Sequence, residues 1–192
     1  MMESASKGME IVSNAKKVYQ KYIKTGEMSD EVIKSCLLLA QLDPIYRAGF
    51  IDPNLGTIDS EDVQDLKNLI KLVDVNLFKS QKVCLLNPTF GEASVIVGGA
   101  DADLLLDDVL IDIKTTKFLA LNRDNLNQII GYYFLFLIGG IGQPPEETTI
   151  NFVCIYYSRY GVLYKIAIKE LLEKCDVRKF IDWFKKRAAN VS

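Results

Sequence analysis

The sequence predicts a mixed α/β (α+β) fold, and three observations support this class. Apolar side chains recur at helical spacing through the first 80 residues, the middle of the chain changes to short apolar and β-branched runs, and helical spacing returns towards the end. The length of 192 residues suits a single domain. We therefore expect residues 1–80 to form a helical N-terminal segment of the same domain whose core spans residues 81–192.

Three helices are expected in the N-terminal segment. The first covers Glu10–Lys24, where apolar residues fall on one helical face. Ser29 is placed to cap a second helix over Asp30–Gln41, because its hydroxyl can accept a hydrogen bond from the first turn. Ser60 is placed in the same way before a third helix over Glu61–Phe78.

The middle of the chain is expected to form strands. The tight-turn residues Asp107-Asp108 separate two of these strands, Ala102–Leu106 and Val109–Ile113. We therefore expect those two strands to form a hairpin with a two-residue loop. The four apolar runs that predict strands are Lys82–Leu86, Ala93–Val97, Ala102–Leu106 and Val109–Ile113.

The remaining elements alternate between helix and strand. A helix is expected over Asp124–Ile138, ended by two glycines, and a hairpin is expected to join Ile150–Tyr157 to Val162–Ile168. The chain closes with helical segments, including Val177–Ala189. Trp183 lies on the apolar face of this last helix, so it is expected in the core.

Several sequence features indicate a cytoplasmic protein with no membrane partner. The longest apolar run, Ile129–Ile141, is too short for a membrane span, which takes about 20 residues. The first ten residues are polar and mixed in charge, unlike a secretory signal. The four cysteines stand far apart with no CxxC pair, and a reducing compartment suits them best.

The chain contains no histidine, which restricts its chemistry. Ser-His-Asp and Cys-His nucleophiles, histidine general bases and histidine-ligated zinc are excluded. Any reaction then depends on carboxylates, lysines, tyrosines, thiols or a bound cation. The net charge is −2, but residues 165–192 carry eight Lys or Arg against four Asp or Glu. A phosphate-binding surface and a solvated amphipathic helix both explain this local excess.

Acidic residues gather on one face of the expected two-residue hairpin. Asp103 falls opposite Asp112 and Asp101 falls opposite Lys114, and alternation along the strands sends all four side chains to the same face. Opposed carboxylates about 5 Å apart repel each other, so the arrangement requires a cation. That cation is either Lys114 or a divalent ion such as Mg²⁺, which suits carboxylate and water ligands. A surface stripe on an edge hairpin is the alternative interpretation.

The order Asp103…Asp112-Ile113-Lys114 resembles the signature of the PD-(D/E)XK nuclease superfamily, in which an Asp on one strand precedes (D/E)-x-K on the next. Gln128 and Tyr132 form Q-x-x-x-Y, which resembles the additional motif of the RecB-like branch. Residues four apart share a helix face, so both side chains can point at one site. The resemblance covers about residues 90–135 and implies a restriction-endonuclease-like core with the order α-β-β-β-α-β.

This resemblance implies a Mg²⁺-dependent nuclease, a hydrolase that binds DNA and cleaves its phosphodiester bonds, with Mn²⁺ as the alternative metal. We favour Asp103 over Asp101 as the principal ligand because it begins the apolar strand and faces Asp112. Glu92 is included because it heads the expected preceding strand. The implied catalytic residues are Asp103, Asp112, Lys114, Gln128 and Tyr132. The implied metal site contains Asp103, Asp112, Asp101, Glu92 and Ile113.

The sequence leaves the substrate and the partners open. RNA is an alternative to DNA, and cleavage within a strand is an alternative to cleavage from its ends. A catalytically silent nuclease-fold module that binds nucleic acid or a protein partner is the alternative function, and a structural protein whose acidic hairpin only binds a metal is a third. A homo-oligomer is compatible with each of these.

Overall fold

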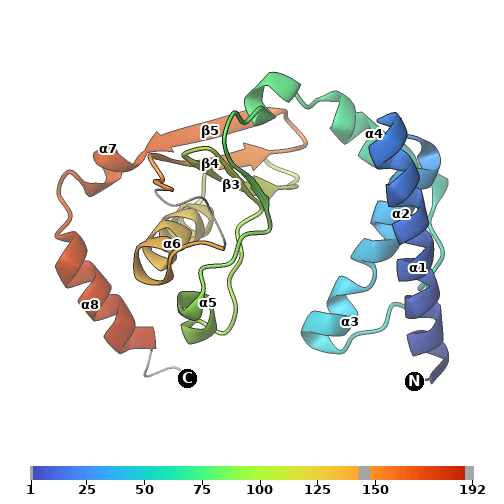
Figure 1. Ribbon diagram of the computed structural model, residues 1–192, viewed down its shortest axis with the longest axis horizontal. Helices are drawn as coiled ribbons and strands as arrows, with labels where there is room; N and C mark the ends of the chain where they lie inside the picture. Colours follow the sequence, from blue (N-terminus) through green and yellow to red (C-terminus); the bar gives the residue numbers. More distant parts are fainter. Residues whose placement is uncertain (1, 143–147, 189–192) are drawn as a thin grey trace. The chain divides into compact units, whose positions relative to one another are not determined.

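A computed structural model describes residues 2–142 and 148–188 of the chain (Figure 1). The chain divides into two compact units between Lys71 and Leu72. We refer to residues 2–71 as the N-terminal unit and to the described residues from 72 onwards as the C-terminal unit. The division falls a few residues before residue 80, where the sequence placed the end of the helical segment. That both units form one domain stays a prediction.

The N-terminal unit is helical, as the sequence predicts. Gly26, with φ of 67°, ends the first helix, and its amide donates to the Tyr22 carbonyl at 2.7 Å. Ser29 caps the second helix, since its Oγ accepts from the Val32 amide. The four helices are α1 (Met2–Thr25), α2 (Asp30–Ala40), α3 (Asp43–Ala48) and α4 (Ser60–Lys71).

The third expected helix differs in its cap and its length. Asp59, not Ser60, is the capping residue, because its Oδ1 accepts from the Glu61 amide at 2.8 Å. The helix ends at Lys71 instead of Phe78. Asp74 accounts for the early end, since its side chain accepts from a backbone amide and starts a separate 3₁₀ turn.

The C-terminal unit contains a five-stranded mixed sheet with strand order β1-β2-β3-β4-β5. Strands β3 and β4 are parallel, and every other neighbouring pair is antiparallel. This confirms the mixed α/β class. The elements are η1 (Val75–Phe78), β1 (Cys84–Leu86), α5 (Glu92–Ile96), β2 (Leu104–Leu106), β3 (Val109–Lys114), α6 (Arg123–Gly139), β4 (Phe152–Tyr157), β5 (Val162–Ala167), α7 (Ile168–Leu172) and α8 (Val177–Ala188).

The hairpin of β2 and β3 has the expected register over its three paired positions, Leu104 to Leu106. Leu106 pairs with Val109 across the two-residue turn, and Asp107 adopts φ of 53°, which the turn requires. The Asp107 carboxylate also accepts from the amides of three residues that lead into β1, at 2.8–2.9 Å. These bonds, first the one from Val83, hold the pKa of Asp107 below its usual value. The turn thus fixes β1 against the hairpin.

The expected strand over Ala93–Val97 is wrong, because this segment is the short helix α5. Ser94 closes the turn: its Oγ accepts from the Phe90 amide at 2.8 Å and donates to the Ala100 carbonyl at 2.7 Å. Ala93 and Ser94 are buried, whereas Val95 is exposed. Tertiary packing therefore overrides the strand preference of the β-branched residues.

Helix α6 connects the parallel strands β3 and β4. It is capped by Asn122, whose side chain accepts from the Asn125 amide, and it contains most of the apolar run Ile129–Ile141. No helix among residues 2–142 and 148–188 is both long enough and apolar enough to cross a membrane.

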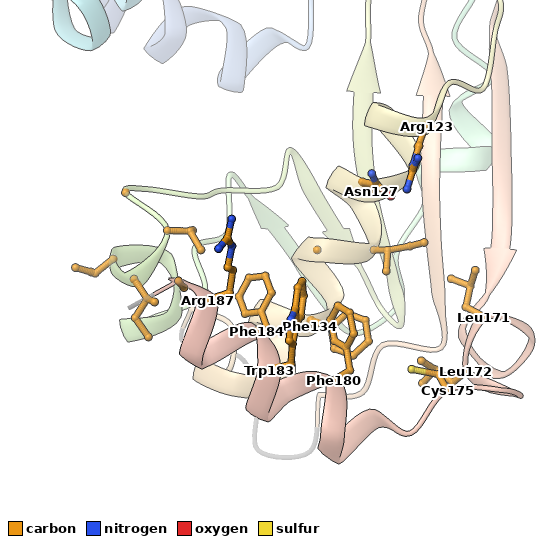
Figure 2. A pocket seen from close by; sticks show the side chains of 17 residues that line it. Arg123, Asn127, Phe134, Leu171, Leu172, Cys175, Phe180, Trp183, Phe184 and Arg187 are labelled. Carbon is orange, nitrogen blue, oxygen red and sulfur yellow. The ribbon is translucent and has the colours of Figure 1, made fainter. Parts of the chain in front are cut away.

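Helix α8 contacts α6 through aromatic rings, since Phe180 lies 4.2 Å from Phe134 between ring centroids (Figure 2). The sequence expectation that Trp183 belongs to the core is wrong, because 56% of its surface is exposed. The expected helix end at Ala189 lies outside the described residues.

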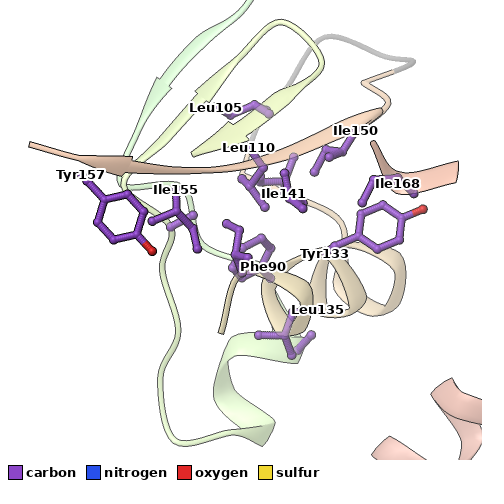
Figure 3. Close-up of a cluster of buried hydrophobic side chains, with 14 residues drawn as sticks. Phe90, Leu105, Leu110, Tyr133, Leu135, Ile141, Ile150, Ile155, Tyr157 and Ile168 are labelled. Carbon is purple, nitrogen blue, oxygen red and sulfur yellow. The ribbon is translucent and has the colours of Figure 1, made fainter. Parts of the chain in front are cut away.

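Two apolar layers cover the two faces of the sheet, and they bury its central strands on both sides. On one face, strand residues pack against α6 (Figure 3). On the other face, Phe78 of η1 packs edge-on against Tyr156 at 4.9 Å. Members of the first layer include Phe90, Leu105, Leu110, Ile129, Leu135, Val153 and Ile155. The second layer is built on Leu106, Ile111, Cys154 and Tyr156.

Two glycines of α6 provide a test of this packing. A Cβ at Gly139 would lie 2.1 Å from the Phe90 carbonyl oxygen, whereas a Cβ at Gly131 would meet nothing within 4 Å. Gly139→Ala is expected to lower the free energy of unfolding by about 1–3 kcal/mol through overpacking. Gly131→Ala is expected to raise it by about 0.5–1 kcal/mol, since alanine is the better helix former. Urea unfolding measures both, and equal effects would contradict this packing.

Candidate active site

The candidate site lies where β2 leaves the sheet and β3 continues. The β2–β3 ladder stops at the pair Leu104 and Ile111, so the last three residues of β3 pair only with β4. Asp103 takes the place of the missing strand: its Oδ2 accepts a hydrogen bond from the Ile113 amide at 2.5 Å. A carboxylate is thereby fixed at the edge of β3 by its backbone.

Asp112 and Lys114 belong to this last part of β3. Asp112 is only 4% exposed, and it shares the parity of Leu110, which packs towards α6. Lys114 Nζ lies 2.7 Å from Asp112 Oδ2, and the lysine side chain retains about a fifth of its exposure. The pair therefore sits at the rim of the layer between the sheet and α6.

Helix α6 supplies the second half of the site. Lys114 Nζ donates to Gln128 Oε1 at 2.6 Å, and Gln128 Nε2 donates to the Tyr132 hydroxyl at 2.8 Å. Gln128 and Tyr132 are one helical turn apart, which gives them the common face that the spacing predicts. Asp112, Lys114, Gln128 and Tyr132 thus form an unbroken series of polar contacts, which we call the contact series.

Tyr132 is held by packing as well as by this hydrogen bond. Its ring stacks on Phe90 at 5.5 Å between centroids and an interplanar angle of 27°. Burial, the main cause, raises the pKa of Tyr132, and the charges of Asp112, Asp101 and Asp103 raise it further. All three aspartates of the sequence motif therefore lie within electrostatic range of this hydroxyl.

Asp112 is a buried carboxylate whose neighbours act on its pKa in opposite directions. Burial raises its pKa, Lys114 opposes the rise, and Asp103 adds to it. Its Oδ2 is fully buried and accepts no hydrogen bond, so the contact with Lys114 is ionic without hydrogen-bond geometry. A buried carboxylate oxygen in this condition favours an additional positive charge beside it.

The structure brings together some of the expected metal ligands. Asp103 and Asp112 are neighbours. The expected position of Asp101 opposite Lys114 is wrong, because the β2–β3 ladder stops at Leu104 and Asp101 forms an isolated bridge with Thr89 instead. Glu92 does not head a strand; it is the exposed first residue of α5, so that part of the expectation is wrong. Ile113 can offer only its backbone, and its amide already bonds to Asp103.

No group of three or more acidic or cysteine side chains arranged to hold a metal ion occurs in the described part of the chain. The donor set nevertheless suits one cation type. Mg²⁺ is commonly bound through one or two carboxylates and keeps several waters. Two neighbouring carboxylates, one with a buried oxygen that lacks a hydrogen bond, fit that pattern.

Sequence reasoning missed the residues that support the site from outside the motif. Phe90 carries no pattern that would predict its stacking on Tyr132. The segment after Lys114 is fixed to the end of β4, where the Tyr157 hydroxyl donates to the Ala120 carbonyl at 3.0 Å. The hydroxyls of Thr115 and Ser158 are hydrogen-bonded to each other at 2.8 Å in the same region.

No protein-family model, no curated protein and no solved structure matches the chain. The geometry around Asp112 and Lys114 therefore carries the functional argument. It consists of two neighbouring carboxylates, one lysine between strand and helix, and two polar side chains that orient this lysine.

The raised pKa of Asp112 predicts a pH-dependent effect of Asp112→Asn on stability. A raised native pKa stabilises the native state below the unfolded pKa, near 4, and this contribution is lost as pH rises through the native value. The stability of Asp112→Asn relative to the intact protein is therefore expected to increase from pH 4 towards neutral pH. Urea unfolding of both proteins without divalent ions measures this difference. A difference that is constant with pH would contradict the raised pKa.

Proposed function

We propose that this protein is a Mg²⁺-dependent nuclease that hydrolyses phosphodiester bonds of DNA, of the RecB-like PD-(D/E)XK type. The contact series carries the proposal. Lys114 Nζ lies 2.7 Å from Asp112 and 2.6 Å from Gln128, whose amide reaches Tyr132 at 2.8 Å. Residues 20 positions apart in sequence thus meet in the combination that the motif implies.

The order of elements also supports a restriction-endonuclease-like core. Three antiparallel strands, β1 to β3, are followed by α6 and by β4, which lies parallel to β3. This is the β-β-β-α-β succession of the proposed core, with the short helix α5 inserted between β1 and β2. The acidic and basic residues lie on the central strand, where such a core would require them.

Asp103 and Asp112 would hold the metal. When bound, Mg²⁺ would supply positive charge that activates water and offsets the charge of the phosphate. Asp103 is already oriented, because the Ile113 amide fixes one of its oxygens. Asp112 presents a buried oxygen whose hydrogen bonding is unsatisfied.

Lys114 would act on the attacking water and on the phosphate by position and charge. Its contact with Gln128 gives the ammonium a fixed partner when Asp112 turns towards a cation. Tyr132 in turn holds Gln128, and its own ring is fixed by Phe90. In the reaction, the attacking water would release a proton to solvent as its oxygen forms a bond to phosphorus, the bond from phosphorus to the leaving sugar oxygen would break, and that oxygen would take up a proton from solvent.

Cleavage of linear and circular DNA in the presence of Mg²⁺ or Mn²⁺ tests the proposal. Asp112→Asn and Lys114→Met are each expected to lower the rate at least about a hundredfold, because the first removes a ligand of the proposed Mg²⁺ and the second removes positive charge beside the phosphate. Asp62→Asn is the matched control: it removes one exposed carboxylate of α4 and is expected to leave the rate unchanged. A chelator is expected to abolish cleavage by all variants.

The outcome also separates the alternatives. Cleavage of linear DNA alone would indicate an exonuclease, and preference for RNA would change the substrate but not the chemistry. Nucleic-acid binding with no cleavage of any DNA or RNA by the intact protein would contradict the enzyme and support a catalytically silent nuclease-fold module.

Metal binding has a readout that does not depend on activity. Mg²⁺ in the millimolar range is expected to raise the thermal unfolding midpoint of the intact protein, because a cation that binds only the native state stabilises it. Asp112→Asn is expected to lose most of this shift, and Asp62→Asn to keep it. Equal shifts in all three proteins would mean that Mg²⁺ acts elsewhere.

A further inference from the structure

A large pocket lies beside the candidate site, on the neighbouring face of α6. It has a volume of about 880 Å³ and is formed by residues of α5, α6, α7 and α8 (Figure 2). This size is within the range of pockets that hold small organic ligands. The contact series does not use any of the residues that line it.

Aromatic rings form one wall of the pocket. Phe134 of α6 meets Phe180 of α8, and Phe180 lies 5.4 Å from Trp183 between ring centroids. Phe184 lies beside them in Figure 2. Trp183 is more than half exposed although it faces this hollow, so a planar ligand could cover its ring.

Two guanidinium groups line the same pocket. Arg123, from the start of α6, and Arg187, from the last turn of α8, lie on different sides of the aromatic rings in Figure 2. No acidic side chain is among the described residues that line the pocket. An apolar aromatic wall with two cations and no anion is complementary to a planar, apolar group that carries negative charge.

The pocket and the contact series share one helix. Asn127 and Gly131 line the pocket, and each directly precedes a residue of the contact series, Gln128 and Tyr132. A Cβ at Gly131 would meet nothing within 4 Å, so the helix surface is open at this residue. A strand that crosses α6 at Gly131 would connect the pocket with the contact series.

We propose that this pocket binds an unpaired nucleotide of single-stranded nucleic acid, whose neighbouring phosphate lies at Lys114. The base would stack on Trp183 and Phe180, and the nucleotide's own phosphate would contact Arg187 or Arg123, whereas the phosphate of the next nucleotide would lie at Lys114. Bases of a duplex are paired and stacked on each other, so they cannot enter such a pocket. The inference rests on the proposed nuclease function and adds to it a preference for single strands.

Trp183 makes the pocket directly observable, because it is the only tryptophan of the chain. Titration of the full chain with a single-stranded oligothymidylate, in EDTA to prevent cleavage, is expected to quench its fluorescence. A duplex of the same length is expected to bind about tenfold more weakly and to leave the fluorescence unchanged. Quenching by thymidine monophosphate at the same concentration as the oligonucleotide would overturn the assignment to a strand.

Arg187→Gln is expected to weaken binding of the oligonucleotide several-fold and to reduce the slope of log affinity against log salt by about 0.7. Lys186→Gln is the matched control, since it removes the adjacent positive charge, which does not line the pocket. Trp183→Ala, at an exposed position, is expected to remain folded by circular dichroism and to weaken binding about tenfold, measured by the fluorescence anisotropy of a dye-labelled oligonucleotide because the variant has no tryptophan. Equal affinities of Arg187→Gln and Lys186→Gln would overturn the inference.

The same titration on Asp112→Asn separates this inference from the proposed function. This variant removes a negative charge beside Lys114, where the phosphate is proposed to lie, so it is expected to bind the single strand at least as tightly as the intact protein. Quenching by oligonucleotide in a protein that cleaves nothing would support the pocket while contradicting the nuclease. Cleavage by an intact protein whose rate on single strands is unaffected by Trp183→Ala and Arg187→Gln would support the nuclease and overturn the pocket.

Discussion

The buried carboxylate of Asp112 imposes the constraint on which the rest of the site depends. It lies on the central strand with 4% of its surface exposed, and burial raises its pKa. A buried charge is costly unless it is paired, and Lys114 provides that pairing at 2.7 Å without a hydrogen bond. Lys114 also donates a hydrogen bond to Gln128, and Gln128 donates one to the Tyr132 hydroxyl. Residues of both α6 and β3 therefore fix the position of the Lys114 ammonium. Because this ammonium is shared with Gln128 and Asp112 Oδ2 accepts no hydrogen bond, the negative charge of Asp112 is only partly compensated.

The fold creates this position by ending one strand early. Because β2 stops at Leu104, the end of β3 has a backbone amide with no strand partner on that side, and Asp103 fills the place with its side chain. The parallel pairing of β3 with β4 requires a crossover, and α6 supplies it. One face of α6 places Gln128 and Tyr132 beside the end of β3, and the neighbouring face of the same helix lines the aromatic pocket. The parallel pairing of β3 with β4 thus determines where α6 lies, and α6 contributes to both the candidate site and the pocket.

The site was more predictable than its surroundings, for physical reasons. A two-residue turn fixes the register of a hairpin, and a period of two fixes the faces, so the pairing of Leu106 with Val109 and the common face of Asp112 and Lys114 follow from local rules. The shared face of Gln128 and Tyr132 follows from helical spacing. In contrast, α5 was mistaken for a strand, because its β-branched residues prefer strands and the hydrogen bonds of Ser94 come from packing. The stacking of Phe90 on Tyr132 and the exposure of Trp183 depend on contacts between distant segments, which a single sequence does not reveal.

The most direct test of this account is the pKa of Asp112 itself, measured by NMR titration of its carboxyl carbon with and without Mg²⁺. The account predicts a pKa above the usual aspartate value in the absence of divalent ions, because burial dominates there. It also predicts that saturating Mg²⁺ moves this pKa below that value, since a bound cation favours the carboxylate. An ordinary pKa that does not respond to Mg²⁺ would contradict the claim that this buried carboxylate is the centre of a cation-dependent site.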